Sequence, residues 1–554
     1  MSRKQRLKKN ELKIEGPRSK ERRIEVRWWV FFLITMTVLL VYINSLNNAF
    51  VSDDLPGILR NPLKMKLFAN LAGNPFGFAY IIVRYFTALI AHDNPLPYRL
   101  VNVLFHSGSA NLIYLILLGS IGFGPAVAAA LIFAVHPLLS EGVVWISAAP
   151  YSAGTFFGLL AVFFYLKSSS VKTDWKGWLA YLCSLSFAQI TISIAPILTV
   201  YEILQGTFRK NWKRLVVFYS MAIGFILINL TGLNTRITTF VETKGSSLSR
   251  PSPLLQAPVA ISNYLSLLLW PDKLTLYHSE MSFTVTQIVW YFVISLLLVS
   301  LAVWGWFRDK RVTFWIMWFF LGISITLTPW GVTWIVAERY TYFGLIGLIV
   351  ASILIYERLI GRRVPKGVSV TILVILLLAL GTRTIVRNRD WKSEDSLWLS
   401  MEKISPSSDQ NHNNLGDLYS RRKEWDKAIE EFKIAVTINP RYSYAFHNLG
   451  NAYLYSDRLD EAAKYYNKAL EINPMIWQTY LQLAVISVKK NDLKSAEEIV
   501  LKGIKINPTT ESWRILGVIY VTGNNKEKAI EAFREALKLD PTNMTARQML
   551  DATY

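Results

Sequence analysis

Cysteine is almost absent from this chain, which holds a single one, Cys183, among 554 residues. An internal disulfide and a cysteine metal cluster are therefore excluded, because each needs at least two thiols. Cys183 lies inside an apolar run, so we interpret it as a packing residue and not as a nucleophile.

Acidic residues are scarce relative to basic ones: 39 Asp and Glu stand against 60 Lys and Arg, for a net charge of +21. A basic excess can indicate nucleic-acid binding, which requires a basic soluble face interleaved with aromatic residues. The polar C-terminal part of this chain mixes both signs instead, so we expect no nucleic-acid partner. The basic residues cluster in loops between apolar runs, as the positive-inside rule predicts for a membrane protein.

Long apolar runs fill the chain up to about residue 386, and polar sequence with helical periodicity follows. We count about eleven candidate membrane spans, at residues 28–44, 99–119, 125–140, 142–166, 176–190, 191–206, 213–234, 285–307, 312–329, 335–357 and 367–386. With eleven spans, the loops richest in Lys and Arg all fall on the cytoplasmic side. The stretch 176–206 is one long helix or a tight pair, and only the pair preserves this charge pattern.

The first 27 residues form a basic tail with eleven Lys and Arg against four Glu. No small-residue cleavage site follows the first apolar run, so we predict a signal anchor with the tail in the cytoplasm. The C-terminal part is then expected on the periplasmic, extracellular or lumenal side of a cell (inner) membrane. Two outer loops, about 46–98 and 235–284, are long, and the second contains an amphipathic stretch, Val259 to Trp270, expected in the interface.

A repeat of 34 residues organises the C-terminal part. Prolines and small residues recur in phase, with successive steps of 34, 34, 34 and 33 residues between the prolines: Pro406, Pro440, Pro474, Pro508 and Pro541, with Gly416, Gly450, Ala484 and Gly517. This is the tetratricopeptide (TPR) pattern of helix-turn-helix units, in which small residues permit close helix crossing. We predict an all-α protein: a basic tail (1–27), a polytopic membrane domain (28–386), a linker or partial repeat (387–408), and four repeats with a capping helix (409–554).

Amide side chains occupy equivalent positions along the predicted groove of the repeats. Asn414, Asn448 and Gln482 are in register, and Asp417 and Asn451 lie three residues after the first two. Amides in register can hydrogen-bond an extended peptide, so Asn414, Asn448, Asn451 and Gln482 are candidate peptide-binding residues. The alternative is that Asn is merely tolerated on a hydrated helix face.

Several polar residues fall at the outer ends of the predicted spans, where burial near lipid is costly and a function is therefore expected. The candidates are Asp53, Asp54, Arg99, His106, His136, Glu141, Gln189, Glu338 and Arg339. A carboxylate among them can act as a general base toward a hydroxyl, while Arg and His can hold a phosphate leaving group. A divalent metal on Asp53, Asp54, Glu141 and His136 is an open question. The competing interpretation is that these residues cap helices and reach outward into the interface.

Five motifs occur in a fixed order along the membrane part: Phe50-Val-Ser-Asp53-Asp54, Pro97-Tyr98-Arg99 to His106, His136-Pro137 with Glu141 and Trp145-Ile146-Ser147, Glu338-Arg339-Tyr340-Thr341-Tyr342, and Arg387-Asn388-Arg389-Asp390-Trp391. Together with the trailing repeats they resemble the transmembrane-and-tetratricopeptide O-mannosyltransferase-like family. This family belongs to the C-type glycosyltransferases, which take sugar from a polyprenyl-phosphate carrier on the outer or lumenal face.

The resemblance implies a catalytic base at Asp53 or Asp54, a second acidic position at Glu141, and a contact of Arg339 with the carrier phosphate. It also implies two partners, a polyprenyl-phosphate sugar donor and a polypeptide acceptor. Two departures stand out. Ala148-Ala149-Pro150-Tyr151 replaces a usual Gly-Arg-Ala-Asp, and Ala188-Gln189 replaces a usual Lys-Glu. Both remove charge from the proposed site.

The sequence therefore favours a membrane glycosyltransferase that moves a mannose-like sugar to Ser or Thr of a polypeptide presented by the repeats. The alternative, from another class, is a non-catalytic membrane anchor whose repeats recruit partners for envelope assembly. Transport is disfavoured because the membrane half shows no obvious internal repeat.

Overall fold

The computed structural model describes residues 11–12, 24–61, 64–168, 170–231, 253–276, 278, 283–327, 335–361 and 363–553. They fall into two compact units, one reaching Ile404 and the other beginning at Ser405. Helices make up both units, and the described strands are two short ones, β1 (Glu11–Leu12) and β2 (Ile24–Glu25), which pair antiparallel. The predicted all-α class is confirmed. Most of the basic tail lies outside the described residues.

Within the described residues, six helical segments are long and apolar enough to cross a membrane: Trp28–Ser45, Pro95–Ile121, Ile146–Lys167, Phe208–Leu230, Val285–Arg308 and Lys366–Asp390. They contain α2 (Trp28–Tyr42), α5 (Pro95–Ile121), α8 (Ala149–Lys167), most of α11 (Phe208–Thr231), α14 (Val285–Arg308) and α17 (Lys366–Asp390). A seventh candidate is the pair Phe123–Val135 and Pro137–Val144, bent by 54°. Its parts are α6 (Phe123–Val135) and, after a 3-10 turn, α7 (Ser140–Val144).

The other predicted spans coincide with shorter helices: α9 (Trp175–Phe187), α10 (Ile194–Gln205), α15 (Lys310–Ser324) and α16 (Leu345–Tyr356). Polar turns shorten them, such as Gln189–Ser193 before α10 and Glu338–Thr341 before α16. Helices of 12 to 15 residues are shorter than the about 20 that a straight crossing requires. Eleven crossings therefore stay a prediction.

The ambiguous stretch 176–206 consists of two helices, α9 and α10. The Tyr181 hydroxyl donates to the carbonyl of Ile192 at 3.2 Å, across eleven positions in the sequence. In one unbroken helix these residues would be about 16 Å apart along the axis, so the chain must turn back between them. The prediction of a pair is confirmed.

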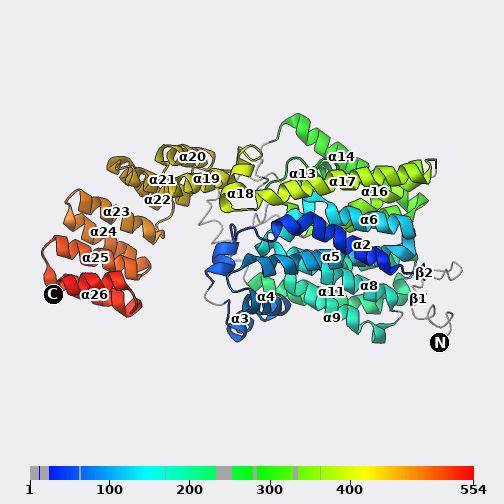
Figure 1. Cartoon of the computed structure of the whole chain (residues 1–554), viewed down its shortest axis with the longest axis horizontal. Coiled ribbons are helices and arrows are strands. Elements are labelled where there is room, and N and C mark those ends of the chain that lie inside the picture. The colour runs from blue at the N-terminus through cyan, green and yellow to red at the C-terminus, as the bar shows by residue number, and fades with distance from the viewer. Residues whose placement is uncertain are drawn as a thin grey trace. The chain divides into compact units, whose positions relative to one another are not determined.

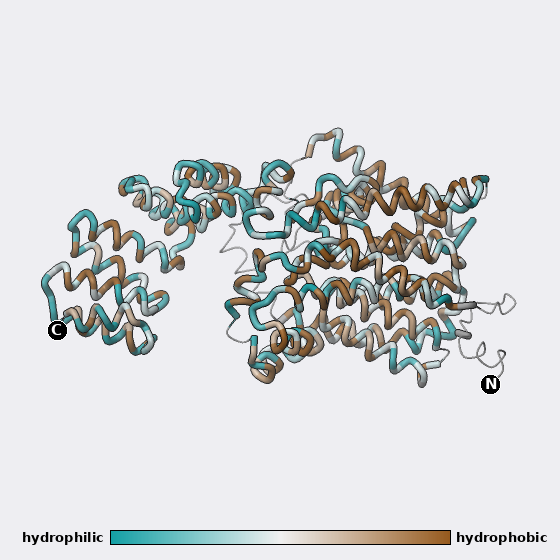
Figure 2. The backbone as a smooth tube through the Cα atoms, in the orientation of Figure 1, coloured by the Kyte–Doolittle hydropathy of each residue, from teal (hydrophilic) through white to brown (hydrophobic). Residues whose placement is uncertain are grey.

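The membrane helices pack side by side, with α5 in contact with α2, α6 and α8, and α17 in contact with α2 and α6 (Figure 1). Figure 2 shows hydrophobic residues concentrated along these helices and hydrophilic ones in the connections at their ends. Helices α15 and α16 approach most closely at Gly347, where an added Cβ would lie 2.3 Å from the Trp315 carbonyl oxygen. Glycine is required there because the two backbones touch.

The predicted outer loop 46–98 contains two helices, α3 (Leu67–Gly73) and α4 (Phe78–Ala91). Helix α4 packs on α5 and α9, and the Ala79 N–H donates to the Ser186 hydroxyl at 2.8 Å. Its other side exposes Ile82, Phe86 and Ile90, with exposed fractions of 37%, 56% and 77%. An apolar face of this size suits a helix lying in the membrane interface. The stretch expected to lie there, 259–270, forms most of α13 (Pro253–Leu269).

The second unit is built from four helix pairs: α19 (Asp409–Arg421) with α20 (Trp425–Ile438), α21 (Ser443–Tyr455) with α22 (Leu459–Ile472), α23 (Trp477–Lys489) with α24 (Leu493–Ile506), and α25 (Thr510–Thr522) with α26 (Lys526–Leu539). Helix α27 (Met544–Thr553) packs on the last pair. Helix α18 (Glu394–Glu402), which carries Trp398, belongs to the membrane unit.

Each repeat is held by a small residue of its first helix against a larger residue of its second. A Cβ at Gly450 would lie 2.6 Å from the Tyr466 ring, and Gly416 and Gly517 face Phe432 and Phe533 in the same way. The third repeat has the smaller Val500 at the ring position and accommodates Ala484, and both are fully buried. Glycine therefore faces an aromatic ring in three repeats, and the larger alanine faces the smaller valine in the third repeat.

The turn inside each repeat contains one residue in the left-handed region: Lys423, Asp457, Asn491 and Asn524, with φ of 60°, 60°, 60° and 56°. The backbone N–H that follows each of them reaches back to a carbonyl five residues earlier, as from Glu424 to Tyr419 and from Arg458 to Tyr453. This hydrogen bond satisfies a carbonyl at the helix end and fixes the turn.

Candidate functional site

Arg99 fixes the loop that carries the acidic pair. Its Nε donates to the Val144 carbonyl at 3.0 Å, and its two terminal nitrogens donate to the carbonyls of Asn48 and Ala49. The side chain is fully buried. Arg99 therefore holds the start of the first loop against the end of α7, and its nitrogens are engaged by the protein itself.

Asp54 is fully buried beside this clamp. Its Oδ1 accepts hydrogen bonds from the Ser147 N–H at 2.7 Å and from the Ser147 hydroxyl at 2.6 Å, and its Oδ2 accepts from the Val51 N–H at 3.2 Å. Burial raises the pKa of the Asp54 carboxyl to about 6, although these hydrogen bonds and the charge of Arg99 act in the opposite direction. The carboxyl therefore changes charge close to neutral pH.

Asp53 lies in a different environment from its neighbour. Its side chain is exposed, and among the described residues it has no hydrogen-bond partner. The preceding residue, Ser52, has a φ of 53°, a left-handed conformation that a serine rarely adopts. One carboxylate of the pair is thus anchored in the protein, and the other is exposed.

Glu141 and Arg339 form a buried ion pair. Glu141 Oε2 accepts from the Arg339 N–H at 3.0 Å, and Glu141 Oε1 contacts Nη1 of the same arginine. The guanidinium lies over two rings, 5.4 Å from the centre of Trp145 and 5.0 Å from that of Tyr340. Tyr151, which replaces the acidic end of the usual family motif, has its ring centre 6.2 Å from that of Tyr340. The Trp145 and Tyr340 rings are therefore both within cation–π distance of this guanidinium.

A second buried pair lies next to the first in sequence and space. Arg387 Nη2 donates to Glu338 Oε1 at 3.2 Å, and its Nη1 donates to Asp390 at 2.9 Å. His278 Nε2 is 3.9 Å from Glu338. Trp391 stacks on Trp145 with 5.8 Å between ring centres, and this stack connects the two ion pairs.

Unpartnered polar atoms gather around these pairs. Among the residues that the structure describes, His278 Nε2, Thr341 Oγ1, Arg387 Nε, Asn388 Oδ1, and Nε1 of both Trp145 and Trp391 are buried without a hydrogen-bond partner. Leaving a buried polar group unpaired costs about 1–3 kcal/mol, so a concentration of them indicates a place that receives a polar ligand. Asp54 adjoins this place through Ser147, two residues after Trp145.

Both predicted histidines are used by the protein. His106 Nδ1 is 2.5 Å from the Tyr342 hydroxyl, and its Nε2 is 3.1 Å from the Ala134 carbonyl. His136 Nδ1 accepts from the Leu138 N–H at 3.2 Å, so its Nε2 donates to the Leu268 carbonyl at 3.1 Å. Gln189 is exposed at the start of the turn before α10. The structure thus brings Glu141, Glu338 and Arg339 together, places Asp54 against Ser147, and gives His106 and His136 partners in the protein.

A metal has no ready ligand set in the described part of the chain, where no group of three or more His, Cys, Asp and Glu side chains is placed to hold one. Both nitrogens of His136, one of the candidate ligands, are already hydrogen-bonded. Glu141, another candidate ligand, is paired with Arg339.

The groove residues divide into two kinds. Asn448 Nδ2 donates to Asn413 at 3.0 Å, and Asn451 accepts from the Tyr466 hydroxyl at 2.6 Å. Asn414 and Gln482 are half-buried, and no hydrogen bond of their side chains occurs within the described residues. Asn448 thus joins two neighbouring repeats and Asn451 joins the two helices of one repeat, whereas Asn414 and Gln482 stay candidate peptide-binding residues.

The sequence did not single out Ser147, Tyr151, Asp390 or His278 as site residues. Ser147 and Asp390 lie inside motifs already noticed, so their position in those motifs was an available signal. Tyr151 was visible only as a departure from a pattern. His278 reaches Glu338 across sixty residues, and no spacing in the sequence predicts that contact.

Comparison with known proteins supports both halves of this description. Tetratricopeptide repeat models match residues 408–474, 447–510 and 510–543, which confirms the predicted repeats. The chain is 23% identical over 479 residues to mouse protein O-mannosyl-transferase TMTC3, covering 74% of this chain and 51% of that protein. Protein O-mannosyl-transferase F38B6.6 of Caenorhabditis elegans is 23% identical over 452 residues, covering 74% of this chain and 63% of its own length. A thermophilic TPR protein of Thermus thermophilus is 18% identical, with a TM-score of 0.27 and coverage of 32% of this chain and 94% of its own.

The resemblance to protein O-mannosyl-transferases with tetratricopeptide repeats is therefore confirmed at the level of sequence. The chain spans about half the length of the mouse protein it matches.

Proposed function

We propose that this protein transfers a mannose-like sugar from a polyprenyl-phosphate carrier to a Ser or Thr hydroxyl of a polypeptide, at the membrane surface where Asp53 and Asp54 lie. The transfer would take place on the periplasmic, extracellular or lumenal side. The relatives are named protein O-mannosyl-transferases, and the carrier, the acceptor and the side of the membrane are what the proposal adds.

One observation carries the proposal. Asp54 bonds to Ser147, two residues after Trp145, and the Trp145 ring lies under Arg339 of the Glu141–Arg339 ion pair, while the neighbouring Asp53 is exposed. Glycosyl transfer from a lipid phosphate requires a base for the acceptor and positive charge for the leaving group. Both kinds of group are present here at the end of a bundle of apolar helices.

The reaction would proceed by direct displacement. The acceptor oxygen bonds to the anomeric carbon, the bond from that carbon to the phosphate oxygen breaks, and the configuration inverts. The acceptor proton passes to a carboxylate, and the polyprenyl phosphate leaves with its negative charge near Arg339. No other reactant is needed for atoms and charge to balance.

Asp53 suits the role of base better than Asp54. Both oxygens of Asp54 already accept hydrogen bonds, from Ser147 and Val51, whereas Asp53 has free lone pairs and is exposed. Asp54 is then a positioning residue that fixes the loop. The repeats would present the acceptor, with Asn414 and Gln482 as the groove amides left available.

The test is transfer of labelled mannose from polyprenyl-phosphate mannose in membranes that contain the full chain, followed by mass spectrometry of the modified proteins. Asp53→Asn should lower transfer at least 100-fold, since general-base help is typically worth about 10²–10⁴-fold. The matched control is Asp93→Asn, in the same outer segment, whose exposed carboxylate pairs with Lys64. Transfer by Asp53→Asn at the rate of this control would refute the assignment of the base.

A second candidate function is a membrane-anchored scaffold that recruits partners through the repeats. Tyr151 favours it, because a neutral side chain stands where the related enzymes usually have an acid. The scaffold predicts that Asp53→Asn retains full cellular function, and that loss of function follows changes at Asn414 and Gln482 instead.

A further inference from the structure

The C-terminal end of α17 connects the first loop to the buried ion pairs. Arg387 donates to Glu338 at 3.2 Å. Trp391, one helical turn later, stacks on Trp145, whose ring centre lies 5.4 Å from Cζ of Arg339. Residues four positions apart lie on the same side of a helix, so one side of this helix end is fixed to the charged part of the candidate site.

Asn388, the residue after Arg387, is bonded to the end of α2 instead. It is fully buried, and its Nδ2 donates to the Val41 carbonyl at 2.9 Å and to Asn44 Oδ1 at 2.8 Å. An amide nitrogen carries two protons, so both of them are used. Asn44 Nδ2 donates in return to the Ile385 carbonyl at 2.9 Å. The end of α2 is thus tied to the end of α17 by two asparagines.

The backbone of the same helix end holds the residues that follow α2. The Asn388 carbonyl accepts from Asn48 Nδ2 at 2.9 Å, and the Lys392 carbonyl accepts from the Ala49 N–H at 3.0 Å. Arg99 donates to the carbonyls of the same two residues, Asn48 and Ala49. The start of the first loop is therefore hydrogen-bonded to α17 as well as to Arg99, a few residues ahead of the acidic pair.

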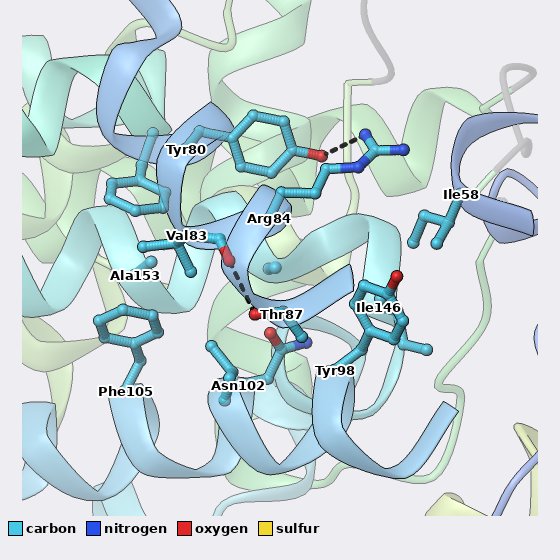
Figure 3. Close-up of a pocket in the computed structure, with 13 residues that line it drawn as sticks. Ile58, Tyr80, Val83, Arg84, Thr87, Tyr98, Asn102, Phe105, Ile146 and Ala153 are labelled. Atoms are coloured by element: carbon cyan, nitrogen blue, oxygen red, sulfur yellow. Dashed lines mark hydrogen bonds between the residues drawn. The ribbon is translucent and has the colours of Figure 1, made fainter. Parts of the chain in front are cut away.

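Apolar contacts also hold the loop. Phe50 and Ile58 belong to a buried cluster with Tyr98 and Ile146, and Figure 3 shows Ile58 on the same side as Tyr98 and Ile146. Hydrophobic contacts are not directional, so they bury the loop without fixing its exact position. The hydrogen bonds from α17 and Arg99 are directional, and they determine where the acidic pair lies.

We propose that Asn388 is a positioning residue for the sugar transfer: acting through the first loop, it sets the place of Asp53 relative to Arg339. The inference rests on the proposed function. Arg387 and Asn388 are consecutive residues of one helix, and they bond to the charged site and to the end of α2 respectively. Loss of the Asn388 side chain would therefore leave both parts in place and loosen one relative to the other.

The first test observes the loop without any transfer. The full chain is placed in nanodiscs of phosphatidylcholine, and hydrogen exchange of its backbone amides is followed by mass spectrometry. Asn388→Ala should speed exchange about tenfold or more in peptides that cover residues 46–58, because the Ala49 N–H is bonded to α17. Exchange within 338–352, on the other side of the helix end, should stay as in wild type.

The matched control is Thr384→Val, one turn earlier on α17. Thr384 is fully buried, and its hydroxyl donates to the Val135 carbonyl at 2.6 Å. This variant loses a buried hydrogen bond of the same helix but none of the printed contacts to the loop, so residues 46–58 should exchange as in wild type.

The second test separates positioning from general stability. In the mannose-transfer assay, Asn388→Ala should lower kcat about 10–100-fold, because small misplacements of a reacting group cost rates of this order. KM for polyprenyl-phosphate mannose should stay within about twofold of wild type, since the surroundings of Arg339 are unchanged. Thr384→Val should keep the wild-type kcat. Adding Asn388→Ala to Asp53→Asn should cause little further loss, because a residue that acts through the base has no effect once the base is absent.

Asn44→Ala is a second variant for the same contact. Asn44 is exposed, so its loss leaves folding intact, yet it removes one of the two acceptors of Asn388. It should change the exchange of 46–58 and kcat in the same direction as Asn388→Ala and by less, and the effects of the two substitutions should not add.

Unchanged exchange within 46–58, a kcat of Asn388→Ala equal to that of Thr384→Val, or a rate loss that multiplies with that of Asp53→Asn would each overturn the inference. Failure of the proposed function gives a different result. Asp53→Asn would then transfer sugar at the wild-type rate, while the exchange of the loop would still respond to Asn388→Ala.

Discussion

Ser147 donates twice to the same atom of Asp54: its backbone N–H lies 2.7 Å and its hydroxyl 2.6 Å from Oδ1. The contact joins residues 93 positions apart. It fixes the first loop to the turn before α8, and that turn also carries Trp145, the ring beneath Arg339. The acidic pair and the arginine are therefore positioned by one short segment.

The first prediction concerns this double hydrogen bond. Ser147→Ala removes the hydroxyl and keeps the N–H, so a buried carboxylate loses one of its donors. We expect a loss of stability of about 1–3 kcal/mol, seen as a lower melting temperature of the detergent-solubilised protein. Ser152→Ala is the matched control, since that buried hydroxyl only donates to a carbonyl of its own helix. An equal effect of both substitutions would contradict a special role of Ser147.

The second prediction is a pH dependence of stability. The pKa of Asp54 is about 6 in the folded protein, above the about 3.9 of an unfolded aspartate. The folded state thus binds this proton more tightly, so its stabilising contribution is complete below about pH 4 and is lost as the pH rises through 6. A shift of about two pH units corresponds to roughly 3 kcal/mol.

Melting temperatures of wild type and Asp54→Asn, measured from pH 4 to pH 8, check this dependence. The difference between the two proteins isolates Asp54 from the other carboxyl groups. The wild type should lose stability relative to the variant between pH 4 and pH 6, and parallel curves would show that Asp54 does not titrate there.

The third prediction concerns the Glu141–Arg339 pair. Glu141→Gln leaves a buried guanidinium without its carboxylate, which typically costs 3–5 kcal/mol. The double variant Glu141→Gln, Arg339→Met removes both charges and should recover part of the lost stability, but it should not recover transfer. Protein yield in membranes and melting temperature report the first effect, and the mannose-transfer assay reports the second. A double variant no more stable than the single one would contradict the ion pair.

The fourth prediction concerns packing inside the repeats. Gly450→Ala places a methyl group 2.6 Å from the Tyr466 ring and should destabilise the second repeat by about 1–3 kcal/mol. Gly523→Ala is the control, because its nearest atom would lie 3.4 Å away. Limited proteolysis of the full chain should cut the Gly450→Ala variant faster within 443–472 and leave the control at the wild-type rate.

The fifth prediction separates the two kinds of groove amide. Asn414→Ala with Gln482→Ala should weaken acceptor binding without changing stability, because neither amide bonds to the protein within the described residues. Asn451→Ala should lower stability instead, since Asn451 accepts the buried hydroxyl of Tyr466. Fluorescence titration with an acceptor peptide and thermal melting distinguish the two effects.

Local patterns predicted much of the fold. The eleven apolar runs all coincide with helices, and the 34-residue period predicts the four helix pairs, because each repeat is specified by contacts within and next to itself. The helices of the loop 46–98 were not predicted, since part of the apolar surface of α4 is exposed and not packed in a core, and Gly73 to Gly77 interrupts the periodicity. Helix lengths also escaped prediction, because polar turns such as Glu338–Thr341 end helices inside apolar sequence.

The site could be predicted only in its residue types. Asp54, Glu141 and Arg339 were identified from charge at the ends of spans; the structure pairs Glu141 with Arg339 and places Asp54 against Ser147. Asp54 is buried and Asp53 is exposed because Asp54 bonds to Ser147, 93 residues away. No local sequence pattern predicts that contact. The sequence did not show that the histidines hydrogen-bond within the protein. A backbone carbonyl partner, such as that of Ala134 for His106, cannot be recognised from residue type.

The clamp at Arg99 bears on how turnover would proceed. Its partners are neutral peptide oxygens, which neither titrate nor dissociate, so no change of acidity or ionic strength within the physiological range would unlock it. If Asp53 is the base, as we propose, this clamp holds the start of its loop in place. The rate of the proposed transfer would then depend on how fast the lipid and the peptide reach and leave a fixed carboxylate.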